Sequence, residues 1–168
     1  MTSKINTLRE DTNKLIRFID KLNENFIIIY PNNDPGSKII LSCYEKIKDK
    51  KYKVLKNLRF EYFLALLKNA KYIIGNSSSA IYEAPMLGTP AINVGDRQHK
   101  RMNSKIVKNL SIDEMEILKI YKFLKSYKKI EKKFYGYGNS DKKFLNILLN
   151  PEFWNIPKQK FFSDLKKK

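Results

Sequence analysis

The chain has 168 residues, with 34 lysines and arginines against 17 acidic residues, which gives a formal net charge of +17. This length fits one domain with a sizeable core, and no apolar run approaches the roughly 20 residues of a membrane helix. The single cysteine, Cys43, excludes an internal disulfide and a cysteine-based zinc site. The N-terminus lacks the apolar core of a signal peptide, so we expect a cytoplasmic protein.

The predicted elements alternate between helix and strand. A capping box at Thr7 and Glu10 predicts the start of the first helix, and apolar residues at helical spacing continue it to Leu22. The next elements are a strand at 26–30, a helix at 39–47, a short strand at 52–55, a helix at 60–67, a strand at 73–74, a helix at 78–87 and a strand at 91–94. Continuous apolar strands separated by helices predict an α/β fold, in which helices cover both faces of a parallel sheet.

Two further helices are expected in the last third of the chain. A second capping box, Ser111 to Glu114, precedes an apolar stripe formed by Ile117, Leu118, Tyr121 and Leu124. A turn rich in glycine and aromatic residues then leads to a last helix, with Asn139 and Ser140 as its caps. We interpret 1–168 as one domain whose C-terminal helix and wrap span 140–168, with Trp154 as a packing anchor.

Polar loops follow three of the predicted strands, in the segments 31–37, 75–85 and 95–98. Serines at a helix start, such as Ser77, Ser78 and Ser79, are usually caps. The unpaired N–H groups at such a start also attract phosphate or carboxylate. Open α/β folds bind ligands at the carboxyl ends of their strands. Three polar loops at one edge of the sheet therefore favour a binding site in addition to capping.

Several kinds of chemistry are disfavoured by what the chain contains. His99 is its only histidine, so no histidine-based metal cluster is expected. The serines do not form a Gly-x-Ser-x-Gly elbow and the chain has no phosphate loop, so we interpret Ser77 to Ser79 as binding groups rather than nucleophiles. Asp34 lies in Asn-Asp-Pro-Gly, which is typical of a turn rather than of an acid catalyst. No metal and no cofactor are implied.

The positive charge points to anionic partners in general. Lysines outnumber arginines and are spread along the chain, and dense stretches such as Lys128-Lys129 are typical of solvated faces. Base readout relies on arginine, asparagine and glutamine in one groove-facing element, which the sequence does not offer. We therefore expect an anionic substrate or an acidic partner, with no specific nucleic acid and no membrane.

Four segments, in order, resemble the hydrolysing UDP-N-acetylglucosamine 2-epimerases of sialic acid and related nonulosonic acid pathways. They are Pro31 to Ser37, Gly75 to Pro85, Gly95 to Gln98 and Tyr135 to Asn139, and the resemblance runs from about Leu15 to Leu149. It implies two Rossmann-like domains arranged as in GT-B glycosyltransferases, of which this chain is similar to the C-terminal, UDP-binding one. The implied reaction eliminates UDP to give a glycal and then adds water, which yields N-acetylmannosamine.

The resemblance also implies a role for individual residues. Ser77 and Ser78 would meet the diphosphate, Glu83 would hold the ribose hydroxyls, and Arg97 would face the phosphates and stabilise UDP as the leaving group. The remaining two implied contacts are Asn32, which would line the same cleft, and Leu58, which would contact uracil.

The chain departs from the family pattern at two places. Lys100-Arg101 stands where the family usually has Gly-Arg, and Ala80 replaces a common glycine. The family's catalytic carboxylates and its histidine belong to a region that this chain lacks, so no catalytic residue is expected here beyond a leaving-group role for Arg97.

Several alternatives are left open. The chain is an excised domain, half of a split enzyme with a separate N-terminal catalytic polypeptide, or a truncated product, and a homo-oligomer is a further option. A non-catalytic binding module and a glycosyltransferase nucleotide domain are the alternative functions. The identity of the UDP-sugar is not encoded in these motifs.

Overall fold

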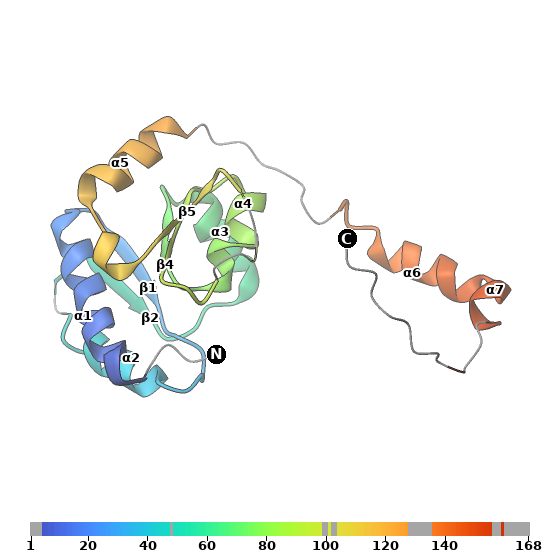
Figure 1. The fold of residues 1–168 in the computed structure, drawn as a ribbon, viewed down its shortest axis with the longest axis horizontal. Helices are drawn as coiled ribbons and strands as arrows, with labels where there is room; N and C mark the ends of the chain where they lie inside the picture. Colours follow the sequence, from blue (N-terminus) through green and yellow to red (C-terminus); the bar gives the residue numbers. More distant parts are fainter. Residues whose placement is uncertain are drawn as a thin grey trace, which may run out of the picture. The chain divides into compact units, whose positions relative to one another are not determined.

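The computed structural model describes residues 5–47, 49–98, 101, 104–127, 136–155 and 159. The chain divides into two compact units, Met1–Lys132 and Lys133–Lys168, and each is described by itself (Figure 1). Within the described residues, no helix is long and apolar enough to cross a membrane.

The first unit is an α/β structure in which every strand pair is parallel, as the sequence predicts. Its N-terminal half contains α1 (Ile5–Lys21), β1 (Phe26–Ile29), α2 (Ser37–Tyr44), β2 (Tyr52–Leu55) and α3 (Phe60–Asn69). Its C-terminal half contains β3 (Ile73–Gly75), the 3-10 turn η1 (Ser78–Ala80), α4 (Glu83–Met86), β4 (Ala91–Val94), β5 (Val107–Leu110), the 3-10 turn η2 (Ile112–Glu114) and α5 (Ile117–Ser126).

Helices cover both faces of the central strand β4, all four residues of which are buried. Ile92 and Val94 pack in one core cluster with α1 and α5, whereas Ala91 packs in a second cluster with α3, η1 and α4. Figure 1 shows α1 and α5 on one side of the strands and α3 and α4 on the other. A strand buried on both faces needs apolar residues on both, which explains its continuous apolar sequence.

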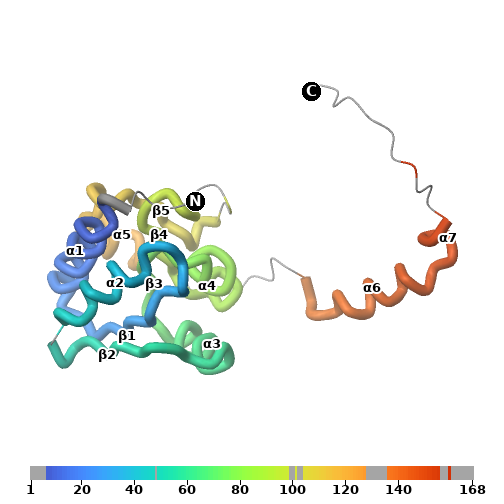
Figure 2. The backbone as a smooth tube through the Cα atoms, turned by 90° about the horizontal axis from the view of Figure 1, so that it is seen from below, coloured from blue at the N-terminus to red at the C-terminus, as the bar shows by residue number. Residues whose placement is uncertain are grey.

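The strands form two ladders, β1–β2 and β3–β4–β5. At their N-terminal ends the ladders are joined by side chains, since the ring of Phe26 meets the ring of Tyr72 edge-on at 6.2 Å. Glu24, just before β1, accepts hydrogen bonds from Lys71 and Tyr72, just before β3. Figure 2 shows β1 and β2 running beside β3 in the same unit. The carboxyl ends of all these parallel strands therefore face one edge of the unit.

Two of the predicted helix starts differ from the structure. The helix α1 already includes Ile5, so Thr7 lies inside it and the capping box predicted there is wrong. The second capping box is confirmed, because the carboxylate of Glu114 accepts from the backbone N–H and the hydroxyl of Ser111. It caps the 3-10 turn η2, however, and α5 begins only at Ile117.

The structure corrects three further details. The helix predicted at 78–87 is the turn η1 followed by the one-turn helix α4. The strand β5 was not predicted, because the exposed Lys108 and Asn109 interrupt its apolar pattern. Leu118, assigned to the buried stripe of α5, is 82% exposed, and the fully buried residue of that helix is Ile120.

The second unit contains α6 (Ser140–Leu149) and α7 (Pro151–Trp154). Asn139 is the N-cap residue of α6, as predicted, although its side chain makes no capping hydrogen bond. Within this unit Trp154 is 65% exposed, its ring lies edge-on to that of Phe153 at 5.2 Å, and its indole N–H donates to the carbonyl of Leu148 at 2.7 Å. Tyr135 and most of the segment predicted to wrap a surface lie outside the described residues.

Candidate functional site

A cleft of about 790 Å³ lies between β1 and β3 and extends to the loops at their carboxyl ends. Its walls come from α1, β1, α3 and β3, and its mouth is formed by the polar loops that follow β1, β3 and β4. Five of the six predicted binding residues line it, namely Asn32, Leu58, Ser77, Ser78 and Arg97. The topology thus brings together side chains that lie up to 65 positions apart in the sequence.

The loop after β1 is held by a tight turn. The amide of Ser37 donates to the carbonyl of Asp34 at 3.0 Å, and Gly36 has φ 91° and ψ −7°. Proline followed by a glycine of this conformation is the sequence of a type II turn. A Cβ on Gly36 would lie 2.4 Å from Cδ2 of Leu8, so the turn packs closely against α1. Asp34 is therefore a turn residue, as predicted, and its backbone is fixed by the scaffold.

The side chain of Asp34 has a second role that the sequence did not reveal. Its carboxylate accepts a hydrogen bond from Nη2 of Arg97 at 2.8 Å. The two side chains are 53% and 46% exposed, and both line the cleft. This ion pair connects the loop after β1 with the loop after β4, across the mouth of the cleft.

The loop after β3 presents hydroxyls and backbone amides. The Oγ of Ser77 accepts from the amide of Ser79 at 3.3 Å, so Ser77 caps the turn η1. No described residue accepts from the amides of Ser77 and Ser78, and both side chains are exposed. The three-residue turn has little helix dipole. Any anion bound here would rely on hydroxyls and loop amides, rather than on the helix terminus that the sequence predicted.

Gln98 connects this loop with the loop that carries Arg97. Its side chain is only 2% exposed, and Nε2 donates to the carbonyl of Asn76 at 3.2 Å. Its Oε1 is buried and has no hydrogen-bond partner in the described structure. The sequence placed Gln98 in a motif but gave no sign that it fastens two loops together, since the partner is a backbone carbonyl.

Glu83, the sixth predicted residue, does not line the cleft. It opens α4, and its Oε2 is buried without a partner among the residues that the structure describes. A buried carboxylate oxygen without a donor is costly. This orphan acceptor can take a hydrogen bond from a hydroxyl group, although the cleft as described does not reach it.

Ala80 is fully buried in the core beside Ile81, so the alanine that replaces a common glycine is accommodated by packing. His99 and Lys100 lie outside the described residues.

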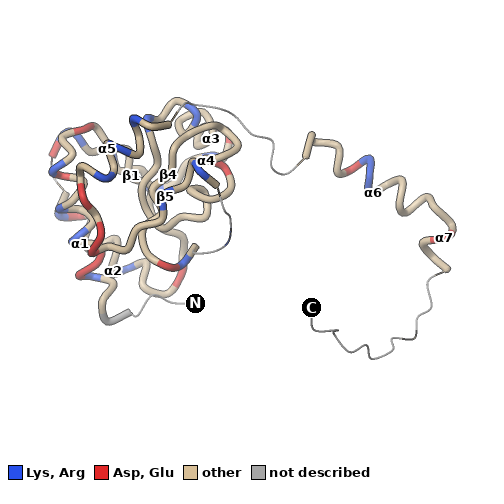
Figure 3. The backbone as a smooth tube through the Cα atoms, turned by 45° about the horizontal axis from the view of Figure 1, so that its top comes forward, with Lys and Arg blue, Asp and Glu red and all other residues tan. Residues whose placement is uncertain are grey.

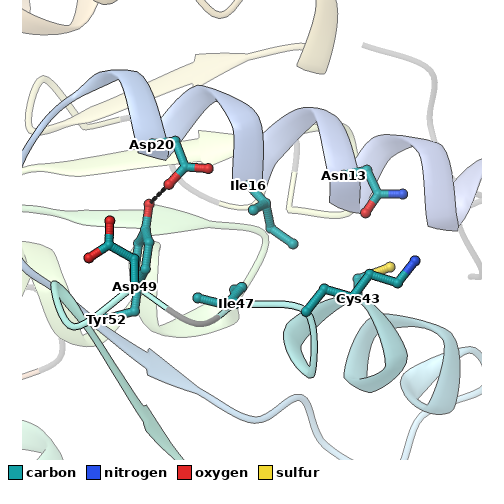
Figure 4. A pocket seen from close by; sticks show the side chains of 8 residues that line it. Asn13, Ile16, Asp20, Cys43, Ile47, Asp49 and Tyr52 are labelled. Atoms are coloured by element: carbon teal, nitrogen blue, oxygen red, sulfur yellow. Dashed lines mark hydrogen bonds between the residues drawn. The ribbon is translucent and has the colours of Figure 1, made fainter.

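A second, smaller pocket of about 160 Å³ lies between α1, α2 and β2 (Figure 4). The hydroxyl of Tyr52 donates to Asp20, and the ammonium of Lys51 lies 3.4 Å from the carboxylate of Asp20 and 3.8 Å from that of Asp49. Cys43 on α2 is 1% exposed and lines the same pocket. Asp20, Asp49 and Lys51 pair with one another here, so we interpret the arrangement as structural. The described residues contain no cluster of ligands that could hold a metal ion.

Comparison with known proteins identifies a family whose sequence model matches this chain. The family model described as UDP-N-acetylglucosamine 2-epimerase matches residues 4–149. A protein of Neisseria meningitidis serogroup B named UDP-N-acetylglucosamine 2-epimerase is 35% identical over 98% of this chain and 45% of its own length. The GDP/UDP-N,N'-diacetylbacillosamine 2-epimerase (hydrolyzing) of Campylobacter jejuni is 32% identical over 69% of this chain and 31% of its own length.

The polysialic acid biosynthesis protein P7 of Escherichia coli is 34% identical over 70% of this chain and 30% of its own length. The chain thus spans less than half the length of these relatives. The fold is similar to a crystal structure of Methanocaldococcus jannaschii UDP-GlcNAc 2-epimerase in complex with UDP-GlcNAc and UDP. That match has a TM-score of 0.64 at 22% identity and covers 84% of this chain and 41% of that one.

Proposed function

The chain belongs to the UDP-N-acetylglucosamine 2-epimerase family, and on that premise we propose that its cleft binds the UDP part of a UDP-sugar. The observation that carries the proposal is the convergence of Asn32, Leu58, Ser77, Ser78 and Arg97 on one cleft, at the carboxyl ends of the strands. Open α/β sheets bind nucleotides at this edge. The fold neighbour from Methanocaldococcus jannaschii, which was crystallised with UDP-GlcNAc and UDP, agrees with this choice of ligand.

Each residue has a role that suits its chemistry. Ser77 and Ser78 offer hydroxyls and amides to the diphosphate, and the guanidinium of Arg97 offers charge-assisted hydrogen bonds to the same group. Leu58 offers an apolar contact to the uracil, and Asn32 offers a polar side chain that lines the same cleft. We also propose that Glu83, which does not line the cleft as described, accepts from a ribose hydroxyl through its orphan oxygen.

The same groups explain how the site would assist a reaction in which UDP departs. Negative charge grows on the departing diphosphate in the transition state, and fixed N–H groups and Arg97 near it lower the barrier. We propose the hydrolysing reaction of the family, elimination of UDP followed by addition of water. The relative from Campylobacter jejuni carries the word "hydrolyzing" in its name.

We propose that nucleotide binding and acid–base chemistry belong to different parts of the family's length. The chain matches less than half of its curated relatives, so this unit is proposed to hold the nucleotide. The acid and base carboxylates then come from the remainder of the family's length, in the same or a separate polypeptide. We further propose that the C-terminal helix and wrap at 140–168 complete this domain, and that the protein works in the cytoplasm on precursors of sialic acid or a related sugar.

Calorimetry with UDP tests the proposal. The wild-type chain should bind UDP, and Arg97→Ala should weaken binding at least about tenfold, since a hydrogen bond to a charged group contributes about 1.5 to 3 kcal/mol. Arg17→Ala is the matched control, because Arg17 is exposed on α1 and does not line the cleft. No binding by the wild type, or equal binding by both variants, would refute the proposal. Turnover of a UDP-sugar is then tested by an assay of the chain alone and of the chain together with the part of the relatives' length that it does not match.

A further inference from the structure

We propose that Asp34 is a positioning residue, which holds the guanidinium of Arg97 across the mouth of the cleft so that its other N–H groups meet the diphosphate. The inference rests on the proposed UDP site and deepens it, because the ion pair adds a residue to that site. It is carried by geometry: two cleft-lining side chains from different loops meet at 2.8 Å.

The Asp34 end of this ion pair is fixed. The turn that contains Asp34 closes through the bond from the amide of Ser37 to the carbonyl of Asp34, and Gly36 packs against the side chain of Leu8 with a φ of 91° that favours glycine. The carboxylate therefore projects from a rigid turn rather than from a free loop.

The Arg97 end is fixed as well, through its backbone. The amide of Gly95 donates to the carbonyl of Leu110 at 2.8 Å, and the buried side chain of Gln98 donates to the carbonyl of Asn76. The loop is thus tied on one side to β5 and on the other to the serine loop after β3. What remains free is the long side chain of Arg97 itself, which is 46% exposed.

Asp34 is the one described partner that restrains this side chain. A guanidinium has five N–H donors in a planar fork, so a carboxylate on Nη2 leaves donors for a second anion. An arginine that is already held loses less rotamer freedom when it binds a phosphate than one that moves freely. A carboxylate that only competed with the phosphate would have the opposite effect, so the sign of the mutant's effect decides between the two roles.

The sequence offers a variant that tests the charge without breaking the turn. Asparagine and aspartate are both favoured at the first position of turns. Asp34→Asn therefore removes the negative charge and is expected to keep the conformation of the turn. By calorimetry on the full chain, we expect it to bind UDP about fivefold more weakly, the upper range for an exposed ion pair. Asp34→Glu, which keeps the carboxylate, should restore part of the loss. Asp113→Asn is the control, because Asp113 pairs with Lys14 at 3.1 Å and does not line the cleft.

A double-mutant cycle separates positioning from a general effect on the fold. On an Arg97→Ala background, Asp34→Asn should cause no further loss of UDP affinity, because its effect passes through the arginine. An equal loss on both backgrounds, or tighter binding by Asp34→Asn, would overturn the inference. If the wild type binds UDP and Arg97→Ala weakens it but Asp34→Asn does not, only this inference fails. Absence of UDP binding by the wild type removes the proposed function itself, and the inference with it.

Discussion

The two ends of the cleft differ in how completely their polar groups are paired. At the end beside the N-termini of β1 and β3, here named the closed end because its polar groups bond to one another, Glu24 accepts hydrogen bonds from the ammonium of Lys71 and from the hydroxyls of Tyr72 and Tyr121, the last two at 2.9 and 3.4 Å. The single O–H of Tyr121 is shared between Glu24 and the carbonyl of Leu22, of which the carbonyl is nearer, at 3.1 Å. Glu24 and the two tyrosines are partly buried and Lys71 is exposed, and their hydrogen bonds connect the loop after α1 with the start of β3 and with α5, which stabilises the fold.

At its open end, by contrast, the polar groups are exposed or incompletely paired. Asp34 and Arg97 are about half exposed, the side chains of Ser77 and Ser78 face solvent, and Gln98 keeps one buried oxygen without a described partner. Figure 3 shows that acidic and basic positions are scattered over the unit rather than gathered on one face. The binding that we propose therefore depends on the placement of a few groups at the mouth, and the net charge of the chain does not indicate where that site lies.

The largest expected effect is on stability, at the closed end. Glu24→Ala removes a carboxylate that accepts from three donors, and the half-buried hydroxyl of Tyr72 loses its hydrogen-bond acceptor. We expect a loss of about 2 to 3 kcal/mol in the free energy of unfolding, measured by urea denaturation. Glu116→Ala, which removes only an exposed pair with Lys119, should cost less than about 0.5 kcal/mol. Equal losses in the two variants would show that the hydrogen bonds of Glu24 stabilise the fold no more than an exposed ion pair does.

A smaller effect is expected at alkaline pH, again at the closed end. Burial, followed by the hydrogen bond to Glu24, raises the pKa of Tyr72. The unfolded chain then releases this proton near pH 10, whereas the folded chain keeps it, so the stabilisation is complete below pH 10 and is lost as the pH rises. One proton changes stability by at most about 1.4 kcal/mol per pH unit, and the partial exposure of the hydroxyl reduces this further.

Urea denaturation at pH 9 and pH 11 measures the contribution of Tyr72. Tyr72→Phe has no hydroxyl to titrate, so it should lose less stability between these pH values than the wild type. A variant that loses as much as the wild type would mean that the hydroxyl is not held in its neutral form.

The smallest expected effect concerns the open end. Ser77→Ala removes the cap of η1 and should cost about 1 kcal/mol of stability. The same change should weaken UDP binding about threefold, since a neutral hydrogen bond contributes roughly 0.5 to 1.5 kcal/mol. Calorimetry at a temperature well below unfolding separates the two effects. Unchanged UDP affinity with reduced stability would leave Ser77 as a cap only.

The sequence was a good guide to what depends on local pattern. The apolar runs predicted β1 and β4, and the polar loops after strands predicted the edge at which Asn32, Ser77 and Arg97 meet. Both signals work because a parallel sheet places all strand ends of one polarity together.

What the sequence missed depends on tertiary contacts. The strand β5 has a polar middle and gains its place from pairing with β4. Asp34 gives a clear turn signal, but its pairing with Arg97 spans 63 positions and leaves no local trace. Gln98 acts through a backbone carbonyl, which no side-chain motif reveals. Thr7 fits a capping box by composition, yet the helix extends past it.

The most direct test of the account is a titration of the isotope-labelled chain with UDP, followed by the backbone amide signals in NMR spectra. If the mouth of the cleft binds UDP, we expect shifts in the loops at 31–37, 76–79 and 95–98, with little change around Glu24, Lys71 and Tyr72 at the closed end. Shifts confined to the closed end or to the pocket around Asp20 and Tyr52, or no shifts at millimolar UDP, would contradict it.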